Sequence, residues 1–252
     1  MKTSRRLILK AGTSLALPVV WPGFAKAEQD FAEESQRGDI EVFPELLRYE
    51  PASIKSASSP VKGTFAPVPS NFRDRLLEEA SRWVGKNRAA DKADISKLMN
   101  LFNLPYAQGG RPLPFCAAGI SYVAAMVYLR NANSSGSDTL EAIRAFLPEL
   151  DHAHFYPTPS VNDMTLVAQG KHRWSPAQSV AQPEAGSVVV FSWSGAGVDH
   201  VGLVKAFTER KLTTIEFNTS SPTVPGSEKN GGCVTIKTRE YPSKYIRGFI
   251  RA

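Results

Sequence analysis

The sequence predicts an α+β domain, because two kinds of hydrophobic pattern follow one another along the chain. From residue 71 to residue 150, apolar residues recur at the spacing of amphipathic helices. From residue 186 to the end, short β-branched or alternating segments are separated by Gly, Pro and charged turns. Helices followed by antiparallel strands are typical of an α+β fold. The chain is long enough for one domain with a sizeable core.

An export signal occupies the N-terminus. Residues 4–10 read SRRLILK, which resembles the twin-arginine (Tat) motif, and an apolar stretch and a small-x-small cleavage site at 25–27 follow. The apolar stretch is short and Pro18 interrupts it, so we expect a cleaved signal peptide and not a membrane anchor. Residues 1–27 would then direct the protein through the Tat translocase, to the periplasm or out of the cell. A Sec signal or an uncleaved anchor is the alternative.

The net charge of +6 comes mainly from this signal. The chain has 30 basic and 24 acidic residues. Five basic residues lie in the signal, which contains no acid: Lys2, Arg5, Arg6, Lys10 and Lys26. The rest of the chain is close to neutral, which removes the main argument for nucleic-acid binding. No later stretch of 18 apolar residues is present, so we expect no membrane span.

A Pro/Ser-rich segment separates the signal from the patterned part of the chain. We interpret residues 28–70 as a linker or arm and residues 71–252 as the folded domain. Helices are predicted over 72–86 with Asn71 as N-cap, 93–104, 113–130, and 137–150 with Ser137 as a cap candidate. Strands are predicted over 186–193, 199–207, 212–220, 232–240 and 243–252.

Cys116 begins the most apolar of these helices. Pro112 and Pro114 precede it, and Pro is favoured in a first helical turn. Unpaired backbone N–H groups and the positive helix end stabilise a thiolate at that position, which favours a nucleophile. The alternative is a small buried core residue, since free Cys packs readily in cores.

A nucleophilic Cys requires a base, and His200 is the strongest candidate of the four histidines. It opens the strand DHVGLVKAF, which should form a hairpin with LTTIEFNTS. On the second strand, Glu216 and Asn218 are expected to share one face. A three-residue turn would place His200 opposite Asn218, whereas a two- or four-residue turn would place it opposite Thr219.

The order of these segments resembles the CHAP family, the cysteine- and histidine-dependent amidohydrolases/peptidases. The resemblance rests on Cys at a helix start, then PEAGSVVVF, DHVGLV and IEFNTS, and it covers roughly residues 100–251. It implies a papain-like fold, with N-terminal helices packed on a C-terminal antiparallel sheet, and an amidase or endopeptidase that cuts peptidoglycan at or near the stem peptide. It also implies that 71–252 is a catalytic domain without a cofactor. The implied site is Cys116, His200, Glu216 and Asn218.

Three positions depart from the pattern of the family. Asp199 precedes the His where Gly is commoner, Phe115 stands where Trp or Tyr is frequent, and Gly119 replaces an aromatic residue. These departures concern the shape of the cleft more than the chemistry.

Acyl transfer is the reaction expected of such a site. Cys116 would attack an amide carbonyl, His200 would shuttle the proton, and Asn218 or Glu216 would hold the imidazole tautomer. The backbone N–H of Cys116 would help to stabilise the oxyanion. Weaker candidates for the oxyanion site and the cleft are Gln108, Trp193 and Tyr106.

Three other interpretations stay open at this point. A Cys116–Cys233 disulfide would make the domain a stapled, non-catalytic scaffold. Asp151, His152 and His154 could belong to a zinc site, although no further ligand stands at a motif spacing. A wall-binding module could keep the CHAP fold without activity, with residues 28–70 covering the cleft.

Overall fold

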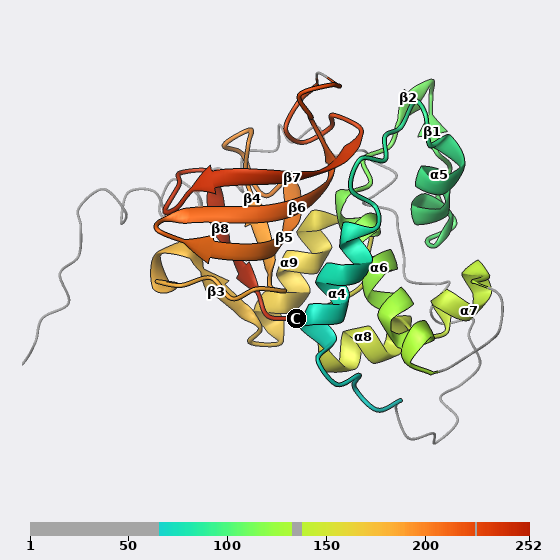
Figure 1. The fold of residues 1–252 in the computed structure, drawn as a ribbon, viewed down its shortest axis with the longest axis horizontal. Helices are drawn as coiled ribbons and strands as arrows, with labels where there is room; N and C mark the ends of the chain where they lie inside the picture. Colours follow the sequence, from blue (N-terminus) through green and yellow to red (C-terminus); the bar gives the residue numbers. More distant parts are fainter. Residues whose placement is uncertain (1–65, 133–137, 225) are drawn as a thin grey trace, which may run out of the picture. The chain divides into compact units, whose positions relative to one another are not determined.

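The computed structural model describes residues 66–132, 138–224 and 226–252, and it is shown as a ribbon in Figure 1. All of them belong to one compact unit, Asp39–Ala252. The predicted signal at 1–27, most of the predicted arm at 28–70 and the cap candidate Ser137 lie outside the described residues. Among the helices of the described part, none is long and apolar enough to cross a membrane.

Three predicted helices are confirmed, with shorter bounds. They are α4 (Phe72–Ser81), α5 (Lys92–Asn100) and α6 (Cys116–Asn131). A short hairpin of β1 (Ala107–Gln108) and β2 (Arg111–Pro112) precedes α6. Asn71 stands at the N-cap of α4 but has a φ of 56° and makes no side-chain cap hydrogen bond, so the predicted cap is wrong in its chemistry.

The predicted helix over 137–150 is instead two short helices, α7 (Leu140–Arg144) and α8 (Leu147–Ala153). Pro148 lies in the first turn of α8, where its missing N–H costs nothing, but it cannot continue a helix from α7. Thr139 caps α7, because its side chain accepts a hydrogen bond from the Ala142 N–H.

One helix was not predicted from the sequence. It is α9 (Val161–Gly170), and the side chain of its N-cap Ser160 accepts from the Asp163 N–H at 3.2 Å. A Ser followed three residues later by an acid is a known helix-start signal, so the sequence did contain this information. The short strand β3 (Trp174–Pro176) and the 3₁₀ turn η1 (Ala177–Ser179) follow.

The predicted strands form one antiparallel sheet. They are β4 (Val188–Phe191), β5 (His200–Thr208), β6 (Lys211–Thr219), β7 (Cys233–Glu240) and β8 (Ile246–Ile250). With β3, the strand order is β3-β8-β4-β5-β6-β7. The α+β prediction is therefore confirmed.

Helix α6 packs directly on this sheet and is buried from Cys116 to Leu129. A Cβ atom at Gly119 would lie 2.4 Å from Cδ1 of Phe217 on β6, so only Gly allows this approach. The valines of α6 share a core with Val188, Val201 and Ile215, while Phe191 and its neighbours form a second apolar cluster. In Figure 1, α4 and α6 lie beside β5 and β6.

The β5–β6 hairpin combines the turn length of one expected register with the strand pairing of the other. Its turn has two residues, Glu209 and Arg210, both with positive φ, as a type I′ turn requires. A β-bulge at Lys205, between Val204 and Ala206, then shifts the pairing by one residue. Glu216 is therefore opposite Gly202, the pairing expected for a three-residue turn.

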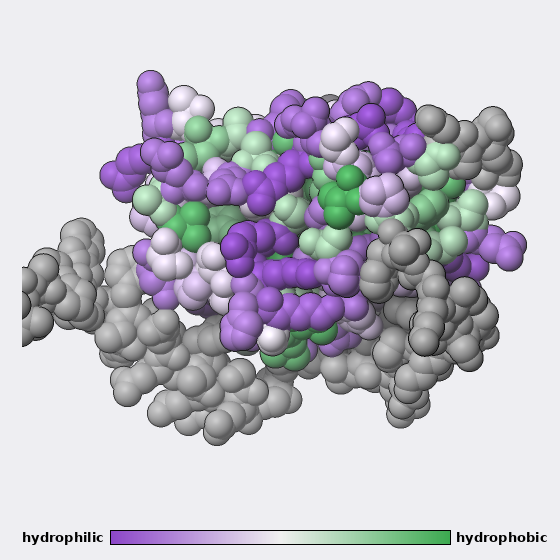
Figure 2. All heavy atoms as spheres, turned by 90° about the horizontal axis from the view of Figure 1, so that it is seen from below, coloured by the Kyte–Doolittle hydropathy of each residue, from purple (hydrophilic) through white to green (hydrophobic). Residues whose placement is uncertain are grey.

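Figure 2 shows one face of the molecule, on which hydrophilic side chains predominate among the described residues. Hydrophobic side chains form small separate groups on this face.

Candidate active site

Cys116 is the first residue of α6, and its side chain is buried, with 2% of the residue exposed. Phe115 precedes it at the N-cap position, and the Arg88 guanidinium lies 5.5 Å from the centre of the Phe115 ring. The backbone N–H groups of a first turn have no acceptor within the helix. The structure therefore confirms that Cys116 lies in the first turn of α6, as the sequence predicted.

His200 is the first residue of β5 and is completely buried. Its Nε2 lies 3.0 Å from Oε2 of Glu216, and the Phe191 ring lies 5.7 Å from its own. A carboxylate can only accept, so Nε2 carries the proton of this hydrogen bond. The other nitrogen, Nδ1, is buried, and none of the residues that the structure describes makes a hydrogen bond of ordinary geometry to it. Nδ1 is thus the nitrogen available to a thiol.

Cys116 and His200 interact electrostatically. Burial lowers the pKa of His200, but the interactions with the Cys116 thiol and the Glu216 carboxylate outweigh burial and raise the pKa to about 9. The imidazole is therefore positioned to exchange a proton with the sulfur of Cys116.

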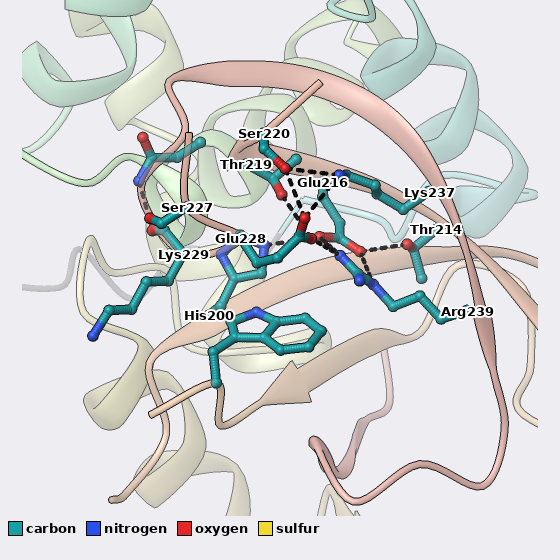
Figure 3. Close-up of polar contacts among 12 residues, drawn as sticks. His200, Thr214, Glu216, Thr219, Ser220, Ser227, Glu228, Lys229, Lys237 and Arg239 are labelled. Atoms are coloured by element: carbon teal, nitrogen blue, oxygen red, sulfur yellow. Dashed lines mark hydrogen bonds and ion pairs between the residues drawn. The ribbon is translucent and has the colours of Figure 1, made fainter. Parts of the chain in front are cut away.

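Glu216 is a fully buried carboxylate with four donors. Its Oε1 accepts from Thr214 Oγ1 at 2.7 Å and from Arg239 Nε at 2.8 Å. Its Oε2 accepts from Arg239 Nη2 at 2.8 Å and faces His200. Burial alone would raise the pKa of Glu216, but His200 and Arg239 lower it to about 2. The carboxylate is therefore ionised, and Figure 3 shows it within this network.

The side-chain hydrogen bonds of Asn218 go to residues other than His200. Its Oδ1 accepts from Arg88 Nη2 at 2.6 Å, and its Nδ2 donates to the Lys229 carbonyl at 3.0 Å. Regular β5–β6 pairing ends at Glu216, and Asn218 has a φ of 60°, which breaks the expected alternation. Of the two predicted orienting residues, the structure brings only Glu216 to the imidazole.

The weaker cleft candidates lie in different places. Gln108 is exposed in the β1–β2 hairpin. Tyr106 is half-buried, and its hydroxyl donates to the Arg88 carbonyl at 2.9 Å. Trp193 lies nearest to the base: its ring stacks on Phe191, which in turn contacts His200.

Arg239 and Glu228 belong to the same network and were missed from the sequence. Arg239 Nη2 donates to Glu228 Oε2 at 2.6 Å, and Glu228 Oε1 accepts from Lys237 Nζ at 3.1 Å and from Ser220 Oγ at 2.6 Å. One feature of the sequence could have indicated this network. Lys237 and Arg239 are two residues apart on β7, so their cationic side chains share one face of the strand that follows β6.

The Cys116–Cys233 disulfide is absent from the structure: both residues are free, buried thiols. The zinc interpretation also finds no support. His154 Nε2 lies 3.0 Å from the Tyr128 hydroxyl and its ring stacks on Phe72, while Asp151 pairs with Lys171. Within the described ranges, no three His, Cys, Asp or Glu side chains are grouped to hold a metal ion.

Residues 109–218 match the family model of the CHAP domain. This range contains Cys116, His200, Glu216 and Asn218, and the match supports the CHAP family.

Two solved structures are similar at low identity. "The crystal structure of Ly7917" is 16% identical, with a TM-score of 0.37, over 71% of this chain and 61% of that chain. "The crystal structure of Ly7917 with the hydrolyzing product of MDP" is 15% identical, with a TM-score of 0.33, over 71% and 62%. The chain thus spans less than two thirds of the Ly7917 chain. No curated protein matches it.

Proposed function

We propose that the protein is a peptidoglycan hydrolase of the CHAP family, with a papain-like catalytic domain that cleaves an amide bond in or next to the stem peptide. The observation that carries this proposal is the convergence of Cys116, His200 and Glu216 within the part of the chain that matches the CHAP domain. The family supplies the substrate class, and the three side chains supply the chemistry.

The reaction proceeds through a thioester. The Cys116 thiol gives its proton to Nδ1 of His200, and the sulfur attacks the amide carbonyl. The N–H groups of the first turn of α6 stabilise the oxyanion of the tetrahedral intermediate. The C–N bond then breaks, and the leaving amine takes the proton from Nδ1. Water, deprotonated by His200, hydrolyses the thioester and restores the thiol.

Glu216 holds the imidazole in the productive tautomer whenever the ring is neutral. Because the ionised carboxylate accepts the Nε2 proton, the neutral ring presents an unprotonated Nδ1 to Cys116. The negative charge also stabilises the imidazolium that forms in each half-reaction.

Muropeptide analysis tests the proposal directly. Purified residues 28–252 are incubated with peptidoglycan under mild reductant, and the fragments are identified by mass spectrometry. We expect new fragments from the wild type and from Cys233→Ala, which removes the other buried free thiol. We expect none from Cys116→Ala. Fragment masses then identify the bond. Equal cleavage by Cys116→Ala, or none by the wild type where a known wall hydrolase cuts, contradicts the proposal.

Export to the periplasm or the medium belongs to the same proposal, because peptidoglycan lies outside the cytoplasm. It is supported by the Tat-like motif at residues 4–10. Replacing Arg5 and Arg6 by Lys should retain the protein in the cytoplasm, as judged by cell fractionation. Unchanged export of this variant would indicate a different route.

A second candidate is a non-catalytic peptidoglycan-binding domain. The observation that favours it is burial, because Cys116 is 2% exposed and His200 is not exposed at all. This candidate predicts that the Cys116→Ala variant and the wild type bind insoluble peptidoglycan equally and release no fragments.

A further inference from the structure

Arg239 lies between two carboxylates and contacts both. Its Nε and Nη2 donate to the two oxygens of Glu216, each at 2.8 Å, and Nη2 also donates to Glu228 at 2.6 Å. A fork of two parallel hydrogen bonds fixes the plane of a carboxylate, which a single point charge does not do. The Glu216 oxygen that Nη2 contacts is the one that faces His200.

The guanidinium is itself held on three sides. Only 15% of the Arg239 side chain is exposed, and the guanidinium lies 4.5 Å from the centre of the Trp193 ring and 5.3 Å from that of Phe191. Glu228 anchors it from the loop that joins β6 to β7, and Lys237 and Ser220 hold Glu228. Figure 3 shows the connected series His200, Glu216, Arg239 and Glu228.

The fork determines which way the Glu216 carboxylate faces. Without Arg239, Glu216 would keep, among the described residues, only Thr214 and His200 as donors in a fully buried position. A buried carboxylate that lacks donors rotates toward new ones or becomes protonated. Either change weakens the acceptor for the Nε2 proton, and the proton can then move to Nδ1. With a proton on Nδ1, the neutral imidazole cannot accept one from Cys116.

From these contacts we infer that Arg239 is a positioning residue for His200, acting through Glu216, with Glu228 as its anchor. The catalytic part of this inference rests on the proposed function. The structural part, control of the His200 tautomer, does not depend on any substrate.

The test uses nuclear magnetic resonance, because the chain has only four histidines. In ¹⁵N-histidine-labelled Cys116→Ala protein, long-range ¹H–¹⁵N spectra are recorded above the pKa of His200, and His200 is assigned by loss of its signals in His200→Gln. The signals distinguish the Nε2–H tautomer from the Nδ1–H tautomer. We expect the Nε2–H form to dominate, and Arg239→Gln to shift the population toward Nδ1–H.

Three further variants separate the effect of the two hydrogen bonds of the fork from the effect of charge alone. Arg239→Lys keeps the charge but not the fork, so it should not restore the tautomer. Glu228→Gln keeps the two hydrogen bonds from Arg239 to Glu216 but removes the negative charge that holds Arg239. It should therefore shift the tautomer population less than Arg239→Gln does. Glu240→Gln changes the adjacent, exposed residue of β7, which pairs with Lys211 at the surface, and should have no effect.

Kinetics supply the second readout. With a soluble stem-peptide substrate, Arg239→Gln should lower kcat about 10- to 100-fold with little change in KM, because the residue acts on the base and not on substrate binding. An unchanged tautomer in both Arg239→Gln and Glu228→Gln overturns the inference, as does full restoration by Arg239→Lys. If Arg239→Gln does not fold, Arg239→Lys decides, because it keeps the charge and removes the fork, and an unchanged tautomer population in this variant overturns the inference. A tautomer shift in a protein without wall hydrolysis would leave the positioning role standing and contradict only the proposed function.

Discussion

At the scale of single residues, Cys116 and Glu216 together extend the pH range in which His200 is charged, because both raise its pKa. The raised His200 pKa, about 9, includes a contribution from the Glu216 carboxylate. The imidazolium form, which gives its Nδ1 proton to the leaving amine, is therefore lost as the pH rises through about 9, and activity should fall over the same range. Glu216→Gln removes the negative charge, so the alkaline limb of kcat/KM should move to lower pH.

This prediction is checked by measuring kcat/KM against pH. Glu240→Gln, which also neutralises a carboxylate but at an exposed site, should leave the alkaline limb in place. A limb that stays near the same pH in Glu216→Gln would show that the carboxylate does not stabilise the imidazolium.

The two thiols provide an internal comparison at the same scale. Cys116 and Cys233 are almost equally buried, at 2% and 3% exposed, but only Cys116 has an imidazole beside it. We expect iodoacetamide to alkylate Cys116 faster than Cys233, because the neighbouring imidazole can accept the thiol proton as the sulfur attacks. His200→Gln should reduce this difference. Site-resolved mass spectrometry over a time course measures both rates, and equal rates in the wild type would contradict the role of His200.

At the scale of secondary-structure elements, the approach of α6 to β6 depends on one glycine. Gly119→Ala would place a Cβ atom 2.4 Å from the Phe217 ring, in a core where neither element can easily move. We expect Gly119→Ala to lower the free energy of unfolding by about 1–3 kcal/mol. Chemical denaturation measures this loss.

Gly170→Ala is the matched control for this prediction. Gly170 is also helical, at the end of α9, and a Cβ atom there would meet nothing within 4 Å. Its free energy of unfolding should therefore be unchanged or slightly higher. A Gly119→Ala protein as stable as Gly170→Ala would show that Phe217 can move aside.

Elements with strong periodicity were predictable, and those defined by tertiary contacts were not. The apolar run after Cys116 and the β-branched run Val188–Phe191 each predicted its element, because burial dictates the pattern. The strand β3 has three residues, Trp174–Pro176, and is defined only by its pairing with β8. No local pattern specifies such a strand.

The residues of the candidate site also divide into those with a local sequence signal and those placed by tertiary contacts. Cys116, His200 and Glu216 carry local signals, namely a helix start, a strand start and an alternating face. The position of Asn218 depends on its left-handed backbone and on a hydrogen bond to Lys229 in the β6–β7 loop, which the alternation of the strand does not predict. Arg239 reaches Glu216 from another strand, 23 residues later, so its role depends on the sheet as a whole.

At the scale of the whole molecule, the buried charges predict a window of maximal stability. The pKa values of Glu216 and Glu228 are lowered from 4.5 to about 2, so their contribution is present above 4.5 and is lost as the pH falls toward 2. The pKa of His200 is raised from 6.5 to about 9, so its contribution is present below 6.5 and is lost as the pH rises through 9. Both contributions are complete between about 4.5 and 6.5.

The melting temperature should therefore be highest in this window and fall on both sides. Thermal unfolding between pH 2 and pH 10 measures it. In His200→Gln the alkaline decline should be smaller, whereas the acid decline should persist because Glu228 still has its cationic partners. A melting temperature that does not decline above pH 6.5 in the wild type would contradict the contribution of His200.

The bulge at Lys205 has a consequence for how this hairpin can change during evolution. A two-residue turn with a bulge and a three-residue turn without one contain the same number of residues. A deletion at Lys205 together with an insertion beside Glu209 and Arg210 would therefore convert one form into the other and keep His200 and Glu216 sixteen positions apart. Because these two changes compensate each other, descendants of one ancestor can differ in the turn and still retain the same His200–Glu216 pair.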